Sequence, residues 1–508
     1  FGGMELNGTD RSRSWFNGVG MQYDMGMLSN YDYRYFKQGN EENTAYYTVS
    51  RTKSREVSFF GTATYSYQGK YTINGTMRYE GSNKLGRSRS ARWLPTWNVS
   101  GAWNMHEESF FESLRPSLSN FTLKASYSLT ADRGPVNVTN SLAVIMGYNP
   151  WRPLSSVNES GLQITDLENS ELTYEKKHEL NIGAEVGFLE NRINLAVDWY
   201  KRNNYDLIGL INTMGVGGQV SKLANVASME SHGVEFTLST RNISTKNFKW
   251  TTDFIFSNAK NKVTELKSDA NVMSMISGSG FALEGNPVRS LYSLNFQGLN
   301  KEGLPTFINE KGELTVTDIN FQERENKSHL VYEGSTDPTI TGSFGNIFSY
   351  KGFKLNVFMT YSFGNVIRLD PVFHNAYSDL DATPREFKNR WTVAGDEKIT
   401  TVPVIADLRQ NTMNSYLNKA YNAYNYSTER IAKGDFIRMK EISVTYEFPK
   451  TMVSKLSLSN LSLKIQGTNL FLLYADKKLN GQDPEFFNSG GVAVPVPKQF
   501  TLTLRLGI

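Results

Sequence analysis

Residues 179–200 read ELNIGAEVGFLENRINLAVDWY, which is two alternating apolar and polar segments joined by a short polar turn. In the second segment Leu195 and Val197 fall on one side of the alternation and Asp198 falls on the other. A β-strand has a period of two residues, so each segment has one apolar face and one polar face. Residues 500–508, FTLTLRLGI, repeat the pattern at the C-terminus. The alternation predicts a protein built from such strands.

Composition narrows the class of protein. The 508 residues are 39% hydrophobic and contain no cysteine, which excludes disulfide frameworks and cysteine-based zinc sites. No apolar run reaches the roughly 18 residues that a transmembrane helix needs. A membrane-spanning strand needs only about 10 residues, half of them polar, so a β-barrel stays possible. A net charge of +4 gives no argument for nucleic-acid binding.

The same alternation recurs along the whole chain. It predicts about 13 strands of the barrel type. Their centres lie at residues 56–67, 70–80, 92–105, 121–132, 175–188, 192–203, 229–242, 246–258, 338–350, 353–364, 433–447, 461–474 and 497–508.

Short and long connections alternate strictly between these strands. Short turns such as 68–69, 189–191 and 351–352 alternate with long polar segments such as 133–174 and 259–337. Outer-membrane barrels place short turns in the periplasm and long loops outside, whereas a soluble sandwich has no reason for this parity. Aromatic residues near the short turns are expected to form the periplasmic girdle: Tyr65, Tyr67, Tyr71, Tyr350, Phe353 and Phe448.

The predicted strand count has a consequence for domain organisation. An odd number of strands cannot close a single-chain bacterial barrel, which has an even number. We therefore expect residues 1–55 to form an extracellular loop or edge segment, with room for an extra hairpin or strand, and residues 56–508 to form the C-terminal part of a barrel. On this interpretation the chain starts in or near an outside loop, and further strands from an N-terminal half complete the wall.

Several segments, in order and spacing, resemble the SusC/RagA family of TonB-dependent transporters from Bacteroidetes. The resemblance covers nearly all of residues 56–508. It is carried by FGTATYSYQGKY at 60–71, WNVSGAWNMHEESFF at 97–111, NSELTYEKKHELNIGAEVGFLENRINLAVDWYKR at 169–202, SYKGFKLNVFMTYSFGN at 349–365, GDFIRMKEISVTYEFPK at 434–450 and GTNLFLLYADKKLNGQDPEF at 467–486.

The resemblance implies an all-β fold, the C-terminal 13 or 14 strands of a plugged barrel of about 22 strands in the outer membrane. It implies import of oligosaccharides or oligopeptides with a SusD-like surface lipoprotein as lid, and energy from TonB acting through a plug domain that this chain does not contain. The expected contacts are the lid, the N-terminal half of the barrel, lipid and the transported substrate. The resemblance leaves open whether two transporter–lid pairs form a dimer.

Two other functions stay open at the level of sequence. One is a passive porin with an open polar lumen, and the other is an enzyme embedded in a barrel. An enzyme needs a nucleophile and base close together, and the five scattered histidines show no such motif and no metal-binding spacing. We therefore expect no catalytic residue, no cofactor and no metal. The charged residues of the polar strand faces are expected to contact a plug and ordered water rather than form a permeation route.

The long loops are the most favourable place for a ligand, because loops on a rigid scaffold carry binding sites. The segment 148–153, YNPWRP, puts an aromatic platform beside a guanidinium between two prolines, which suits sugar rings or peptide carboxylates. A second segment, in the 365–432 loop, offers similar groups. The candidate ligand or lid contacts are Tyr148, Asn149, Trp151, Arg152, His374, Asn375 and Tyr377.

Overall fold

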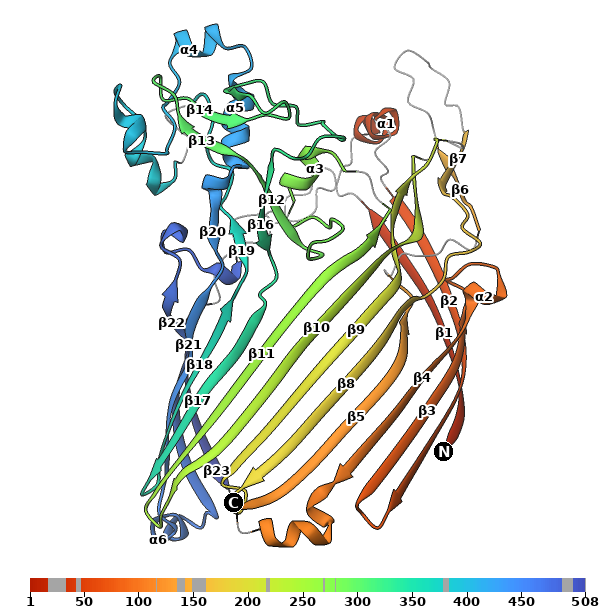
Figure 1. The fold of residues 1–508 in the computed structure, drawn as a ribbon, viewed down its shortest axis with the longest axis vertical. Coiled ribbons are helices and arrows are strands. Elements are labelled where there is room, and N and C mark those ends of the chain that lie inside the picture. The colour runs from red at the N-terminus through yellow and green to blue at the C-terminus, as the bar shows by residue number, and fades with distance from the viewer. Residues whose placement is uncertain are drawn as a thin grey trace.

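A single large antiparallel sheet of 14 strands dominates the molecule (Figure 1). The computed structural model describes residues 1–508 except 17–32, 43–46, 116, 135–141, 149–160, 216–219, 268–269, 279, 378–382, 487–496 and 508. We call this sheet the wall. Its strands, in spatial order, are β1 (Gly2–Phe16), β2 (Tyr47–Tyr67), β3 (Tyr71–Ser82), β4 (Trp93–Asn104), β5 (Leu118–Asp132), β8 (Glu175–Phe188), β9 (Ile193–Asn212), β10 (Ser221–Ser244), β11 (Phe248–Leu266), β17 (Ile340–Tyr350), β18 (Phe353–Phe363), β21 (Phe436–Glu447), β22 (Asn460–Ala475) and β23 (Gln499–Gly507).

All the strands expected from the alternation are present, and each pairs with its neighbour along the chain. The wall also contains β1, which lies in the expected edge segment and pairs with β2 along its whole length. β9, β10 and β11 extend well beyond the predicted strands at the end with the long loops, because their pairing continues through register shifts near Asn225 and Ala227. Part of the expected loop 204–228 is therefore strand.

The register confirms the expected faces of the wall. Val197 pairs with Ala184 on β8 and Phe236 on β10, so these apolar side chains share one face. Asp198 pairs with Gly183 and Glu235 on the opposite face. We call these the apolar face and the polar face. A one-residue slip would exchange the two, so the pairing tests the prediction directly.

The tight turns gather at one end of the wall, together with the short helix α6 (Lys450–Val453) (Figure 1). Gln68 and Gly69 have φ of 54° and 69°, and Lys351 and Gly352 have φ of 45° and 89°, so both two-residue turns need the left-handed region. Aromatic rings accumulate here as expected. Phe353 lies 4.5 Å from Tyr446 between ring centroids, and Tyr446 lies 4.9 Å from Phe448.

The long connections lie at the opposite end and carry their own secondary structure (Figure 1). Small strands form two-stranded and three-stranded sheets there, and short helices lie among them. These strands are β6 (Val144–Tyr148), β7 (Gly161–Asp166), β12 (Ser290–Leu294), β13 (Phe296–Leu299), β14 (Pro305–Ile308), β15 (Leu314–Thr315), β16 (Leu330–Ser335), β19 (Val366–Arg368) and β20 (Ile431–Lys433), and the helices are α1 (Tyr33–Glu41), α2 (Arg89–Arg92), α3 (Val272–Ile276), α4 (Leu408–Met413) and α5 (Leu417–Asn425).

Two of the long connections pack into one compact unit, which we call the cap. It comprises the described residues of 270–330 and 372–426. Its core holds Phe307 and Leu294, both 0% exposed, and Tyr421 and Tyr424 from α5, both 1% exposed. Phe373 packs edge-on against Tyr424 with ring centroids 5.0 Å apart. These connections therefore fold around their own hydrophobic core.

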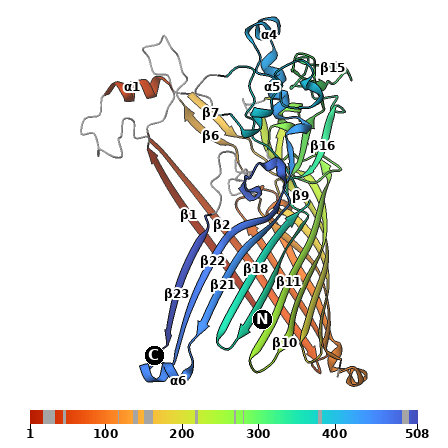
Figure 2. The ribbon, with the colours of Figure 1, turned by 90° about the vertical axis from the view of Figure 1, so that its left-hand side faces the viewer.

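β1 and β23 form the two edges of the wall, and neither has a second partner among the described strands (Figure 2). The amino group of Phe1 donates to the carbonyl of Thr62 over 3.0 Å, partway along β2. The expectation that the chain starts in or near an outside loop is therefore wrong, because the first residues already belong to a wall strand. Among the described residues, no helix has the length and apolar character that crossing a membrane would require.

Candidate functional site

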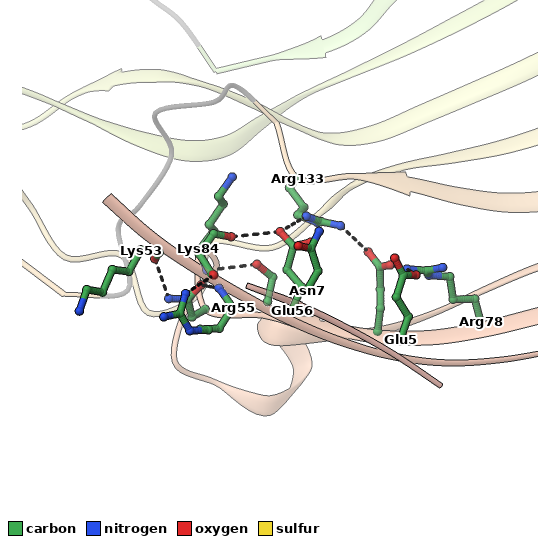
Figure 3. Close-up of polar contacts among 12 residues, drawn as sticks. Glu5, Asn7, Lys53, Arg55, Glu56, Arg78, Lys84 and Arg133 are labelled. Atoms are coloured by element: carbon green, nitrogen blue, oxygen red, sulfur yellow. Dashed lines mark hydrogen bonds and ion pairs between the residues drawn. The ribbon is translucent and has the colours of Figure 1, made fainter. Parts of the chain in front are cut away.

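Charged side chains on the polar face meet near the start of β1, midway along β2 and near the loop end of β3 (Figure 3). Arg78 donates from Nη2 to Glu5 over 2.9 Å and from Nε to Glu80 over 2.8 Å. Arg133, just beyond β5, forms ion pairs with Glu56 on β2 and, over 3.7 Å, with Glu80 on β3. We call this group the rim network: Glu5, Glu56, Arg78, Glu80 and Arg133. It joins β1, β2, β3 and the start of the loop after β5 across β4.

Polar neighbours donate further hydrogen bonds to the Glu56 carboxylate of the rim network. Ser54 donates to Glu56 over 3.1 Å, and Asn7 on β1 donates to Glu56 over 3.5 Å. Glu56 and Glu80 are 17% and 16% exposed, so the network is half-shielded from water. A half-buried charge is costly unless it is paired, and here each carboxylate has a guanidinium. The arrangement holds the strands in register rather than poising a group for proton transfer.

Tyr174, directly before β8, lies close to the charged groups of this network. It is 0% exposed and packs with Leu85 and Leu94 in a small apolar core. Burial raises the pKa of its hydroxyl, so the group stays protonated. Its oxygen has no hydrogen-bond partner among the described residues. A buried hydroxyl without a partner is uncommon, and near the rim network both Tyr174 and Ser58, the cross-strand neighbour of Glu5 and Glu80, have one.

Two buried arginines hold loop segments in place, one on the wall and one directly before β20. Arg438 on β21 is 4% exposed and pairs with Asp483 and, over 2.8 Å, with Glu485, which follow β22. Arg430 is 3% exposed, pairs with Glu386 in the cap and lies 4.9 Å from the Phe373 ring centroid. Such pairs are strongly destabilising to break, because removal of one partner leaves a buried charge. The loops are therefore held in place electrostatically as well as by packing.

A third arginine lies between the cap and the wall. Arg368 on β19 donates from Nη2 to the carbonyl of Tyr292 and the hydroxyl of Ser293 on β12. Burial lowers the pKa of Arg368 to about 10, and burial raises the pKa of the nearby Glu333 carboxyl. Both shifts have the sign that desolvation gives, since burial disfavours the charged form of either group.

The structure describes three of the predicted contact residues in the 365–432 loop. The backbone N–H of His374 donates to the Tyr377 hydroxyl over 2.9 Å, and the Asn375 side chain donates to Asn411 over 2.9 Å. The Tyr377 ring packs against Phe387 with centroids 4.9 Å apart, so it belongs to the edge of the cap core. His374 is exposed. Ligand or lid contact by these three residues stays a prediction.

The other predicted segment is described only in part. Tyr148 ends β6, which pairs with β7 outside the wall. Asn149, Trp151 and Arg152 lie outside the described residues. Their role stays a prediction.

The interactions that sequence reasoning missed are those between residues far apart in the chain. Arg133, Arg430 and Arg438 were not singled out, although each is the centre of an ion pair. Their partners lie 77, 44 and 45 positions away, so no local pattern marks them. Arg438 does occupy a polar-face position on its strand, which was the available signal. Among the described residues no cluster of three or more acidic, histidine or cysteine side chains is arranged to hold a metal.

Comparison with known proteins agrees with this architecture. A family model described as TonB dependent receptor-like, beta-barrel, matches residues 2–370. The chain belongs to this family. Its wall is therefore part of an outer-membrane β-barrel, with the apolar face toward lipid and the polar face toward the lumen.

Relatives extend the comparison to most of the chain. TonB-dependent receptor P3 of Formosa agariphila is 26% identical over 445 residues, which cover 84% of this chain and 42% of the relative. TonB-dependent receptor SusC of Bacteroides thetaiotaomicron is 23% identical over 495 residues, covering 92% of this chain and 44% of SusC. The chain thus spans less than half the length of these relatives.

A solved structure shares the fold. The structure of the RagAB peptide transporter aligns with a TM-score of 0.76 and 21% identity, covering 100% of this chain and 53% of that chain. At this identity the likeness concerns the fold alone. It agrees with the expectation that this wall is a portion of a larger barrel of the SusC/RagA type.

Proposed function

We propose that this chain is the wall and outer mouth of an energised importer that takes up oligosaccharides or oligopeptides. The observation that carries the proposal is the family match over residues 2–370, together with a packed cap at the loop end of the wall. A passive porin needs no structured unit of this size at its mouth. The cap gives a preformed surface on which a lid and a ligand can be bound.

The importer proposal also implies two protein partners. A SusD-like surface lipoprotein would rest on the cap and release substrate into the lumen, and TonB would act through a plug inside the complete barrel. The names of the matched proteins, SusC and the RagAB peptide transporter, support partners of this kind. The chain itself would supply wall, loops and docking surface, with no covalent chemistry.

The proposed substrate is either an oligosaccharide or an oligopeptide. The cap and the 148–153 segment offer aromatic rings beside arginine and amide groups, which suit both sugar rings and peptide carboxylates. Mass spectrometry of ligands that co-purify with the protein from the outer membrane would distinguish glycans from peptides.

Energy coupling gives the sharpest test. Uptake of the co-purifying substrate is measured in cells before and after a protonophore dissipates the inner-membrane proton gradient. Loss of uptake with unchanged surface binding supports the importer. Uptake that persists without the gradient would replace it with the passive porin.

A further inference from the structure

The apolar face of the wall ends abruptly along one line across β9, β10 and β11. On β9 the apolar series runs through Leu195, Val197 and Trp199, and the next residue on that face is Lys201. On β10 the corresponding step is from Val234 to His232. On β11 the face passes from Phe256 through Asn258 to Lys260. The lipid-facing band thus gives way to two lysines and a histidine on three consecutive strands.

These three residues are direct cross-strand neighbours. Lys201 pairs with His232, and His232 pairs with Lys260, so their side chains share one face. We call them the cationic row. Neighbouring strands lie about 4.8 Å apart, which places the two lysines about 10 Å from each other. The two ammonium groups flank the imidazole on one face with no acid between them, and an anion placed there would lower their mutual repulsion.

No such anion is supplied by the described part of the chain. All three side chains of the cationic row are exposed, and none has a hydrogen bond or ion pair among the described residues. Other cations near the loop end of the wall do have acidic partners. Arg202 pairs with Glu179, Lys176 with Asp206 and Arg289 with Asp337. The acid closest along β10 on the same face is Glu230, which stands opposite Lys262 rather than within the row.

Aromatic rings place the row at the membrane boundary. Trp199, next below Lys201 on the same face, is 38% exposed. From β4 to β9 itself, the rings of Trp97, Tyr127, His178 and Tyr205 form a ladder with centroids 5.5 to 5.7 Å apart. Aromatic side chains of this kind concentrate at the level of lipid headgroups. β9 runs from the turn end of the wall to the loop end (Figure 1), and Lys201 follows Leu195, Val197 and Trp199 in that direction, so the row lies on the outer-leaflet side of the apolar band.

We propose that Lys201, His232 and Lys260 form a binding site on the lipid-facing surface for the phosphate of an anionic lipid in the outer leaflet. Lysines bind phosphate as point charges, and a phosphate above Trp199 could contact the ammonium groups from both sides. The lipid's chains would then cover the apolar residues below. The site is independent of the proposed transport function, since it depends only on the position of the wall in the membrane.

The test uses the protein purified from the outer membrane in mild detergent, with diphosphoryl lipid A as the probe and its dephosphorylated form as the reference. Native mass spectrometry measures the affinity for each. The double variant Lys201→Gln, Lys260→Gln should bind the phosphorylated probe about 30-fold more weakly, at about fivefold per lysine. The reference lipid should bind both proteins equally. His232→Gln should weaken binding of the phosphorylated probe less than the double variant does.

A matched variant controls for total charge. Lys301→Gln, Lys398→Gln removes two exposed cap lysines and should leave the affinity unchanged. Heat-modifiable mobility on gels shows that each variant is assembled, and if the double variant does not assemble, the single lysine variants should each show the fivefold loss. Equal binding of the two lipids by the unaltered protein, or equal loss in the matched variant, would overturn the site. Binding of inorganic phosphate as tight as that of the probe would show that the source is not lipid.

Discussion

The wall and the cap place their apolar side chains in opposite ways. In the wall the large apolar residues point outward, as Ile73 at 61% and Leu502 at 70% exposed illustrate, and charged groups occupy the other face. In the cap Phe307 and Leu294 are 0% exposed, and charged groups lie at the surface. The wall is built for lipid and the cap for water. One chain can therefore contain a lipid-facing region and a water-facing region, because the two regions are built from different secondary-structure elements.

The two regions also differ in what holds them together. Every wall strand depends on backbone pairing with its neighbours, since in lipid an unpaired backbone group costs several kcal/mol. The cap has only small sheets and depends on side-chain packing around α5 and β14. The buried ion pairs do not join the cap core to the wall strands: Arg430, directly before β20, pairs with Glu386 in the cap, and Arg438 on β21 pairs with Asp483 in the loop after β22. Damage to one region should therefore leave the other largely intact.

The largest effect is expected in the cap core. Phe307→Ala should destabilise the cap by about 3–5 kcal/mol, because it removes a fully buried ring and leaves a cavity. Limited proteolysis of the cap should accelerate, while heat-modifiable mobility of the barrel stays unchanged. Leu408→Ala is the control, since Leu408 on α4 is 85% exposed and should change nothing. Loss of barrel assembly in the Phe307 variant would contradict the independence of the two regions.

The second effect probes the wall. Val197→Arg or Leu195→Arg near the bilayer midplane should cost about 2–4 kcal/mol, because it places a cation in hydrocarbon. Denaturant titration of the assembled protein measures the loss. The control is Thr237→Arg, one strand away on the polar face, where the charge meets water in the lumen. Equal losses in both variants would mean that the wall is not sided as the register indicates.

A smaller effect is expected at the loop segment that the structure does not describe. Trp151→Ala with Arg152→Ala should weaken substrate capture or lid association by about 1–3 kcal/mol and leave assembly intact. Growth on the cognate substrate and co-purification of the lid are the measurements. Trp151→Tyr alone keeps an aromatic platform and should retain most of the function. Unchanged growth and unchanged co-purification in the double variant would remove both residues from the site.

The smallest expected effect is a pH dependence of stability that the cap should show and the wall should not. His329 in the cap is 5% exposed, and burial lowers its pKa below the ordinary value of 6.5. The folded cap therefore binds fewer protons than the unfolded chain. The stability associated with neutral His329 is fully present above about pH 6.5 and declines as pH falls from there toward the lowered folded pKa.

Hydrogen exchange, corrected for its intrinsic pH dependence, measures this at pH 7.5 and 5.5. Cap peptides should exchange faster at the lower pH, whereas the wall strands should not change. His329→Gln should abolish the difference because it removes the titrating ring. A pH response of equal size in that variant would assign the effect to another group.

Most of the wall could be predicted from the amino-acid sequence alone. Alternation with a period of two specifies which residues face lipid, and a strand carries this information within about 10 consecutive residues. The faces of Leu195, Val197 and Asp198, the turn end and the loop end all followed from it. β1 was harder to recognise, because its residues 7–14, NGTDRSRS, are almost wholly polar. Pairing with β2 along its full length is what makes it a strand.

The cap, the rim network and the cationic row could not be predicted from the sequence and become visible only in the folded chain. Phe307 and Tyr424 are more than 100 positions apart, and a local pattern cannot show that they share a core. Arg133 finds Glu56 across two intervening strands, and Lys201, His232 and Lys260 become neighbours through the register of three strands. The difference arises because a strand pattern is set by neighbouring residues, whereas these three features depend on residues far apart in the chain. Periodicity is local, whereas packing and ion pairing depend on which distant segments the fold brings together.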